Sequence, residues 1–200
     1  MTLGASSVTC ATRRGQSGLR AGVLLAAFAV ALGLRVAVGG SGVSQSQPAG
    51  LVFAACLLLL AMSCRTRLHV SARALLTGGA GGLLICLPVA LSQLLAGSPL
   101  HGTAGLWPWA LVVAVVAGAE EMFLRGTLYD AVSELAGSHW AVCVGAVAFA
   151  LLHVPLYGWH VLPLDLAVGV VLGMLRASTG SVVAPATAHV IADWAGWFLR

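Results

Sequence analysis

Charged side chains are scarce in this sequence, and lysine is absent. Only 8% of the 200 residues are charged, whereas a soluble domain normally carries about 25%. Hydrophobic residues make up 60% of the chain and the mean hydropathy is +0.99, which is more apolar surface than a water-soluble fold can bury. The basic residues are all arginine and give a net charge of +4, without the interleaved aromatic residues that stack on bases. We therefore expect a lipid bilayer as partner, and no nucleic acid.

Several catalytic and metal-binding motifs are also missing. The cysteines have no C-x-x-C or other ligand-like spacing, which argues against a disulfide framework or a thiolate zinc site. They are Cys10, Cys56, Cys64, Cys86 and Cys143. The sequence has no Gly-x-Ser-x-Gly, no catalytic Ser/Lys pair and no H-E-x-x-H, so serine-hydrolase and zincin chemistry have no support.

Long apolar stretches recur along the whole chain. A helix needs about 20 apolar residues to cross about 30 Å of hydrocarbon. Stretches near this length occur at 19–38, 48–63, 73–96, 106–131, 139–157, 161–177 and 181–199. The second and the sixth are short. We predict an all-α fold, a polytopic transmembrane helical bundle of about seven helices.

The distribution of arginine over the connectors predicts the topology. The segment 63–73 holds three arginines, whereas 39–49 and 97–105 hold none. By the positive-inside rule, the N-terminus is then cytoplasmic and the C-terminus external, in a multi-pass protein of the cell membrane.

The N-terminal segment resembles a signal peptide in the order of its charges. Arg13, Arg14 and Arg20 precede an apolar run, and the first two form a twin arginine. Because the run continues to about Val38 without a clear small-x-small cleavage site, we favour a retained first helix.

A few ionisable residues lie inside the apolar stretches, where each charge costs about 2.5–3.5 kcal/mol. The run GAEEMFLRG places Glu120, Glu121 and Arg125 in one helix. The spacing of four puts Glu121 and Arg125 on one face, able to pair. Glu120 is turned about 100° away and has no basic partner in its own helix, so we expect it to remain free to accept a proton.

Two further helices repeat the four-residue spacing, with Phe149 and His153 in one and His189 and Asp193 in the other. At 1.5 Å per residue, the two histidines lie roughly 20 Å and roughly 13 Å from the cytoplasmic ends of their helices. Glu120 lies roughly 17 Å deep if its own helix continues to about residue 131. These similar depths predict that the carboxylate and the two imidazoles converge in one intramembrane pocket.

Such a pocket is suited to the activation of a water molecule. Glu120 can act directly as a general base, or a metal held by His153 and His189 can lower the pKa of the water. His189 or Asp193 can then stabilise a developing oxyanion by donating a hydrogen bond. The residues alone leave both routes open.

The three spacings resemble those of the CAAX protease and bacteriocin-processing (CPBP, Abi) family of intramembrane endopeptidases, which includes the Rce1-type CAAX prenyl proteases. The family patterns are E-E-x-x-x-R, F-x-x-x-H and H-x-x-x-N or D, in that order on successive helices. Here they are EEMFLR at 120–125, FALLH at 149–153 and HVIAD at 189–193. The resemblance covers about 106–200 and includes GVVLGMLRASTGSVVAPATAH, the approach to the third motif.

The resemblance implies roles for the residues of the first motif and for the aromatic of the second. Glu120 matches the water-activating general base, and Glu121 with Arg125 matches the pair that orients the motif. Phe149 matches the aromatic residue of the second motif, where we expect it to pack and shape the pocket.

The resemblance also implies roles for the remaining site residues. His153 and His189 match the histidines that bind or polarise the water, or that hold a divalent metal such as zinc where one is proposed. Asp193 completes the catalytic set at the position that is Asn in the CAAX-processing members. An Asn amide donates a hydrogen bond at any pH, whereas Asp must be protonated to do so.

We accordingly expect three parts in the chain: a cytoplasmic N-terminal tail at 1–18, N-terminal transmembrane helices at 19–105, and catalytic helices at 106–200. Gly169 and Gly173 form a G-x-x-x-G, for which we expect close helix packing alone. The implied activity is hydrolysis of a peptide bond in a membrane-associated protein or peptide, either prenylated or bacteriocin-like.

Two other classes of protein fit the same residues. A transporter or proton-coupled carrier uses intramembrane carboxylates and histidines as a relay, although no inverted repeat is visible here. A catalytically silent relative would act as a membrane scaffold or immunity protein. Two charges outside the motifs receive no catalytic role: we expect Arg35 to extend toward the external surface, and Asp165 to cap its helix or face water.

Overall fold

The computed structural model describes residues 5–64, 68–97 and 102–199. All regular elements in these ranges are helical, which confirms the all-α prediction. The main helices are α1 (Ala5–Gly39), α2 (Gln47–Ser63), α3 (Ala72–Ala96), α4 (Leu106–Glu121), α5 (Tyr129–Ala136), α6 (Ser138–Tyr157), α7 (Leu162–Thr179) and α8 (Val183–Phe198). A π-helix, η2 (Met122–Leu128), joins α4 to α5, and two short 3-10 turns are η1 (Gly40–Gly42) and η3 (Trp159–Val161).

The helices match the predicted stretches closely. α4, η2 and α5 form one continuous helical segment, Leu106–Ala136, which corresponds to the predicted stretch 106–131. Within the described ranges, five segments are long and apolar enough to cross a membrane: Gly15–Gly42, Ala72–Ala96, Leu106–Ala136, Ser138–Tyr157 and Trp159–Thr179. The last of these includes the stretch 161–177, which the sequence analysis described as short. α2 is apolar but only 17 residues long. α1 begins at Ala5, so the helix extends into the segment 1–18 that we expected to be a tail.

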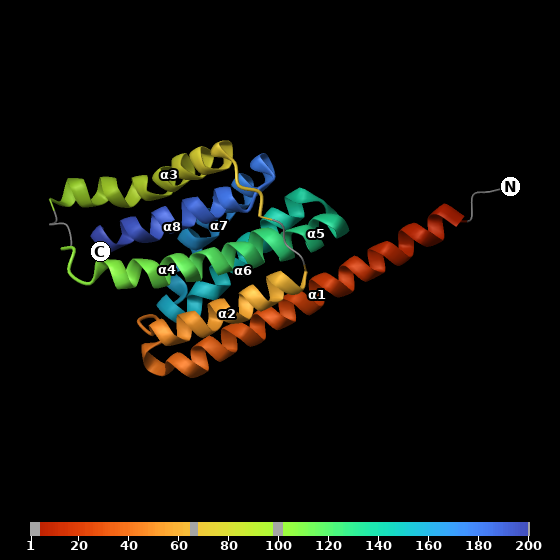
Figure 1. The fold of residues 1–200 in the computed structure, drawn as a ribbon, viewed down its shortest axis with the longest axis horizontal. Helices are drawn as coiled ribbons and strands as arrows, with labels where there is room; N and C mark the ends of the chain where they lie inside the picture. Colours follow the sequence, from red (N-terminus) through yellow and green to blue (C-terminus); the bar gives the residue numbers. More distant parts are fainter. Residues whose placement is uncertain (1–4, 65–67, 98–101, 200) are drawn as a thin grey trace.

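Six helices close into a ring. α1 contacts α2, α2 contacts α4, α4 contacts α8, α8 contacts α7, α7 contacts α6, and α6 returns to α1. α3 lies outside this ring, against α8 and α7 (Figure 1). The N-terminal end of α1 extends well beyond the bundle (Figure 1). A ring of this kind can enclose a space that is lined by polar side chains from several helices.

Glycines allow the ring helices to approach closely. A Cβ added at Gly169 of α7 would lie 2.8 Å from Cα of Ala146 in α6, and one at Gly173 would lie 2.9 Å from Cγ1 of Val142. The predicted packing role of the G-x-x-x-G is thus confirmed. α3 uses the same device, because a Cβ at Gly82 would lie 2.9 Å from the carbonyl oxygen of Ala188 in α8.

The connectors group at the two ends of the bundle as the topology prediction requires. Ser181 Oγ, between α7 and α8, donates to the carbonyl oxygen of His69 at 2.6 Å. At the other end, Trp197 Nε1 near the C-terminus donates to the carbonyl oxygen of Gly102 at 2.8 Å. Which end faces the cytoplasm stays a prediction, and two of the three arginines of 63–73 lie outside the described residues.

Candidate active site

The carboxylate pair ends α4, and the π-helix η2 follows directly. Where hydrogen bonding changes from i→i+4 to i→i+5, a carbonyl group loses its regular partner, and such segments are frequent at functional sites. Here the carbonyl oxygen of Arg125 accepts a hydrogen bond from Nε of Arg176 in α7 at 2.8 Å. The apolar pattern predicts a regular α-helix through this region. The structure keeps the helix continuous but widens it just after the carboxylates.

Glu121 and Arg125 form the ion pair that their spacing predicts. Nη1 of Arg125 lies 2.7 Å from Oε1 of Glu121, and both side chains are almost fully buried. Nη2 of Arg125 also donates to the carbonyl oxygen of Gly169 at 3.1 Å, and its guanidinium carbon lies 4.9 Å from the centroid of the Phe149 ring. Removing one partner of a buried pair of this kind typically costs about 3–5 kcal/mol.

His189 contacts Glu121, which corrects the expected division of the two carboxylates. Nδ1 of His189 lies 3.0 Å from Oε1 of Glu121, the oxygen that Arg125 also contacts. Similar depth predicted that His189 lies beside Glu120, and the four-residue spacing predicted Arg125 as the partner of Glu121. Depth fixes the level of a side chain but not the direction in which it points. Glu121 therefore orients two side chains, one in its own rod and one in α8.

Glu120 is not free, because Arg35 of α1 reaches it. Nη1 of Arg35 lies 3.3 Å from Oε1 of Glu120, and the two side chains are 11% and 4% exposed. The guanidinium carbon lies 5.0 Å from the centroid of the Phe53 ring. The expectation that Arg35 extends to the external surface is thus wrong. A charged side chain in an apolar environment is stabilised by an oppositely charged partner. Arg35 finds that partner on α4, although α1 packs mainly against α2.

His153 is held by the backbone of its own helix. Nδ1 of His153 lies 2.9 Å from the carbonyl oxygen of Phe149. Because a carbonyl oxygen only accepts, Nδ1 carries the hydrogen, and Nε2 of the neutral ring is an acceptor. The Tyr157 ring stacks on the imidazole at 5.9 Å between centroids. The Phe149 ring lies between the two histidines, 4.6 Å from His153 and 5.2 Å from His189, edge-on to both.

Two aspartates flank the histidines. Oδ2 of Asp193 lies 3.6 Å from Nε2 of His189, with its side chain 37% exposed. Oδ2 of Asp165 lies 3.8 Å from Nδ1 of His153, with its side chain 17% exposed. The expectation that Asp165 only caps its helix or faces water is therefore wrong, since the start of α7 turns this carboxylate toward α6.

The structure brings the predicted residues together around one cavity. The cavity has a volume of about 480 Å³ and lies inside the ring, between α1, α2, α4, α6 and α8. The ionisable or hydroxyl-bearing side chains that line it are those of Arg35, Glu120, His153, Tyr157, His189 and Asp193, together with the polar connector 44–47. Sequence reasoning missed Arg35, Asp165 and Tyr157. The available signal was the presence of Arg35 and Asp165, two charged residues outside the motifs, in apolar stretches.

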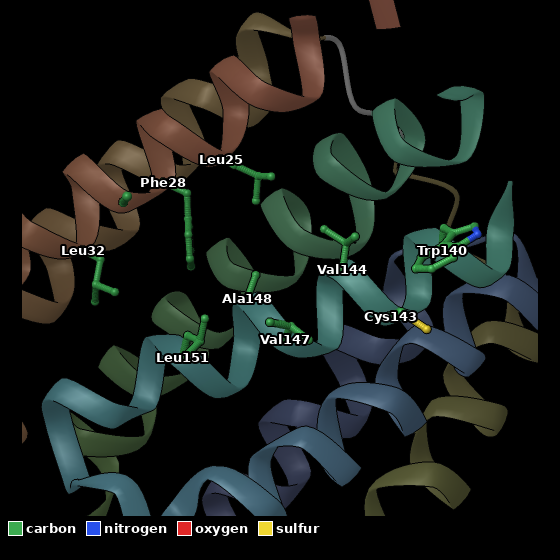
Figure 2. A pocket seen from close by; sticks show the side chains of 10 residues that line it. Leu25, Phe28, Leu32, Trp140, Cys143, Val144, Val147, Ala148 and Leu151 are labelled. Atoms are coloured by element: carbon green, nitrogen blue, oxygen red, sulfur yellow. The ribbon is translucent and has the colours of Figure 1, made fainter. Parts of the chain in front are cut away.

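An apolar groove lies on the seam between α1 and α6 (Figure 2). Its volume is about 510 Å³, and its lining includes Phe28 and Leu32 of α1 and Val147 and Leu151 of α6. Leu32 precedes Arg35 by one helical turn and Leu151 precedes His153 by two residues. Groove and cavity are thus lined by different residues of the same two helices, α1 and α6.

A metal held by His153 and His189 is the alternative to direct activation of the water by Glu120. Among the described residues, no three His, Cys, Asp or Glu side chains are grouped so as to hold a metal ion. Nδ1 of His153 is used by a carbonyl group, and Nδ1 of His189 by a carboxylate. This leaves Nε2 of each ring, and metal-ligating histidines commonly show the same pattern. The metal stays a prediction, and we derive no step through it.

Fold and site together define a multi-pass helical membrane protein with a polar, carboxylate-containing cavity at the level of its membrane helices. Residues 102–195 match the family described as type II CAAX prenyl endopeptidase Rce1-like. The match supports the family that the three motifs predicted. No curated protein and no solved structure matches the chain.

Proposed function

We propose that the protein is an intramembrane endopeptidase in which Glu120 activates the attacking water. The observation that carries this proposal is the convergence of Glu120, His153, His189 and Asp193, from three different helices, on one cavity inside the helix ring. The family match supports the reaction class.

Water activation uses the free oxygen of Glu120 and the acceptor nitrogen of His153. Arg35 contacts Oε1 of Glu120, so Oε2 takes a proton from the water. The second hydrogen of the water bonds to Nε2 of His153, whose Nδ1 is fixed by Phe149. The hydroxide that forms attacks the carbonyl carbon of the scissile peptide bond, and the carbonyl oxygen becomes an oxyanion.

The oxyanion is stabilised by a donor on α8, either Nε2–H of a doubly protonated His189, whose Nδ1–H is bound to Glu121, or a protonated Asp193. Nε2 of His189 lies 3.6 Å from Asp193, so it is held in place but not fully engaged. A donor of this kind is typically worth about 10²–10³ in rate. The C–N bond then breaks, and Glu120 returns its proton to the leaving amine.

The apolar groove supports a prenylated substrate. A prenyl chain is a hydrocarbon, and the groove offers a predominantly apolar lining on two helices that also line the cavity, α1 and α6 (Figure 2). A membrane-associated protein or peptide entering along the seam between α1 and α6 would place its lipid in the groove and its peptide bond in the cavity. The matched family is described as type II CAAX prenyl endopeptidase Rce1-like.

Proteoliposomes carrying the full chain test this proposal. A farnesylated, internally quenched peptide is offered as substrate, and fluorescence reports hydrolysis. We expect cleavage by the wild type and none by Glu120→Gln of equal thermal stability. A pH-driven solute flux without hydrolysis would point to the carrier, and neither activity would point to the scaffold or immunity protein; either result overturns the proposal.

A further inference from the structure

The one cation in contact with Glu120 among the described residues comes from α1, which lies outside the matched range 102–195. Nη1 of Arg35 lies 3.3 Å from Oε1 of Glu120, although the two residues are 85 positions apart. We propose that Arg35 is a positioning residue that keeps Glu120 aimed into the cavity, so that the N-terminal helices complete the active site. This inference rests on the proposed function.

The second buried arginine cannot serve Glu120, because its guanidinium is already committed. Nη1 of Arg125 is bound to Glu121, and Nη2 to the carbonyl oxygen of Gly169. The face of the guanidinium lies against Phe149. Each of the two buried carboxylates therefore has one arginine, and the arginine of Glu120 is Arg35.

The surroundings of Arg35 fix its guanidinium at this place. The plane lies over Phe53, which is fully buried, at 5.0 Å from its centroid. Phe28, two turns earlier on α1, packs against both Phe53 and Phe123 and thereby locks α1 to α2 and η2. Nε of Arg35 is buried and has no hydrogen-bond partner within the described part of the chain. The ion pair with Glu120 is thus the polar contact that orients the guanidinium above the Phe53 ring.

The geometry also suits a positioning role better than a purely structural one. Arg35 and Glu120 both line the cavity, whereas a pair that only tied α1 to α4 would be placed away from it. The contact occupies Oε1 and leaves Oε2 for the water. Losing it would let the Glu120 side chain adopt other rotamers, so the rate of the chemical step should fall while substrate binding is kept.

The matched control lies on the same helix. Arg20 also pairs with a carboxylate, Glu134, at 3.4 Å, but both side chains are exposed and neither lines the cavity. An exposed pair of this kind contributes little to stability. Arg20→Ala therefore removes the same kind of pair from the same helix without touching the site.

The experiment measures kcat and KM for the farnesylated, internally quenched peptide in proteoliposomes of wild type, Arg35→Ala, Arg35→Lys and Arg20→Ala. We expect Arg35→Ala to lower kcat about 100-fold with KM within about twofold. Arg35→Lys should keep a larger fraction of kcat, because it retains the charge. Added guanidinium ion, below concentrations that unfold the protein, should raise kcat of Arg35→Ala about tenfold and leave the wild type unchanged. Arg20→Ala should behave as the wild type.

Infrared difference spectra give a readout that does not depend on cleavage or on the peptide chosen. The spectrum of Glu120→Gln minus wild type identifies the carboxylate band of Glu120. We expect that band to shift in Arg35→Ala and to stay in place in Arg20→Ala.

The outcomes separate the two proposals. Wild-type kcat and an unmoved Glu120 band in Arg35→Ala overturn the positioning role, even if Glu120→Gln is inactive. A loss of kcat in Arg35→Ala that guanidinium does not reverse and Arg35→Lys does not lessen also overturns it, because that pattern marks a structural role. Full cleavage by Glu120→Gln overturns the proposed function instead.

Discussion

Nδ1 of His189 lies 3.0 Å from Oε1 of Glu121, the oxygen that Nη1 of Arg125 contacts at 2.7 Å. A single buried oxygen thus connects α8 to the start of η2. The carboxylate that looked like one half of a helical ion pair orients a candidate catalytic imidazole as well. Glu120, its neighbour, is directed the other way, toward Arg35 of α1.

Arg125→Met should destabilise the protein by about 3–5 kcal/mol, because it leaves Glu121 buried without its arginine. Thermal unfolding in one detergent measures the loss. The double variant Glu121→Gln with Arg125→Met should recover much of it, since no unpaired charge is then buried. A single variant as stable as the wild type would show that the pair is dispensable.

Gly169→Ala should destabilise the protein by about 1–3 kcal/mol, because the new Cβ overpacks the contact between α7 and α6. It would lie 2.8 Å from Cα of Ala146, which is backbone and cannot rotate away. Gly79→Ala in α3 is the matched control, since a Cβ there meets nothing within 4 Å. Equal melting temperatures for the two variants would contradict the packing argument.

Asp193→Asn should keep kcat within about tenfold of the wild type, because an amide oxygen still accepts from His189 Nε2 and its NH₂ can donate to an oxyanion. Asp193→Ala should lose about 10²-fold, because both functions disappear. Steady-state cleavage of the farnesylated peptide distinguishes them. Identical rates for the two variants would remove Asp193 from the site.

The length of the helices and the order of the motifs could be predicted from the sequence. Bilayer thickness fixes how many apolar residues a helix needs, so the ends of α2, α3 and α6 fall within one residue of the predicted stretches. The π-helix could not be predicted, because one inserted residue hardly changes the pattern of an all-apolar helix. The start of α1 at Ala5 was not predicted, because residues 5–18 lack a continuous apolar run.

Contacts between site residues of one helix could be predicted from the sequence, whereas contacts between site residues of different helices could not. The four-residue spacings identified Glu121 with Arg125 and placed Phe149 beside His153. The contacts of Arg35 with Glu120 and of Asp165 with His153 depend on which helices are neighbours and how each is rotated. One sequence without a repeat carries no information on either, so these partners required the structure.

The groove makes a prediction about substrate choice. Val147→Trp should fill the apolar groove and raise KM for the farnesylated peptide about tenfold, equivalent to about 1.4 kcal/mol. KM for the same peptide without its lipid should not change. Leu84→Trp, at an exposed position of α3 away from the groove, is the control. An unchanged KM in Val147→Trp would place the lipid elsewhere.

The central claim is that Glu120 activates the water that cleaves a membrane-associated substrate. Its most direct test is a comparison of protein and peptide termini in cells that carry either the wild-type chain or Glu120→Gln at equal membrane abundance. We predict shortened termini that appear only with the wild type and so identify substrate and cleavage site together. The same shortened termini with Glu120→Gln would contradict the account.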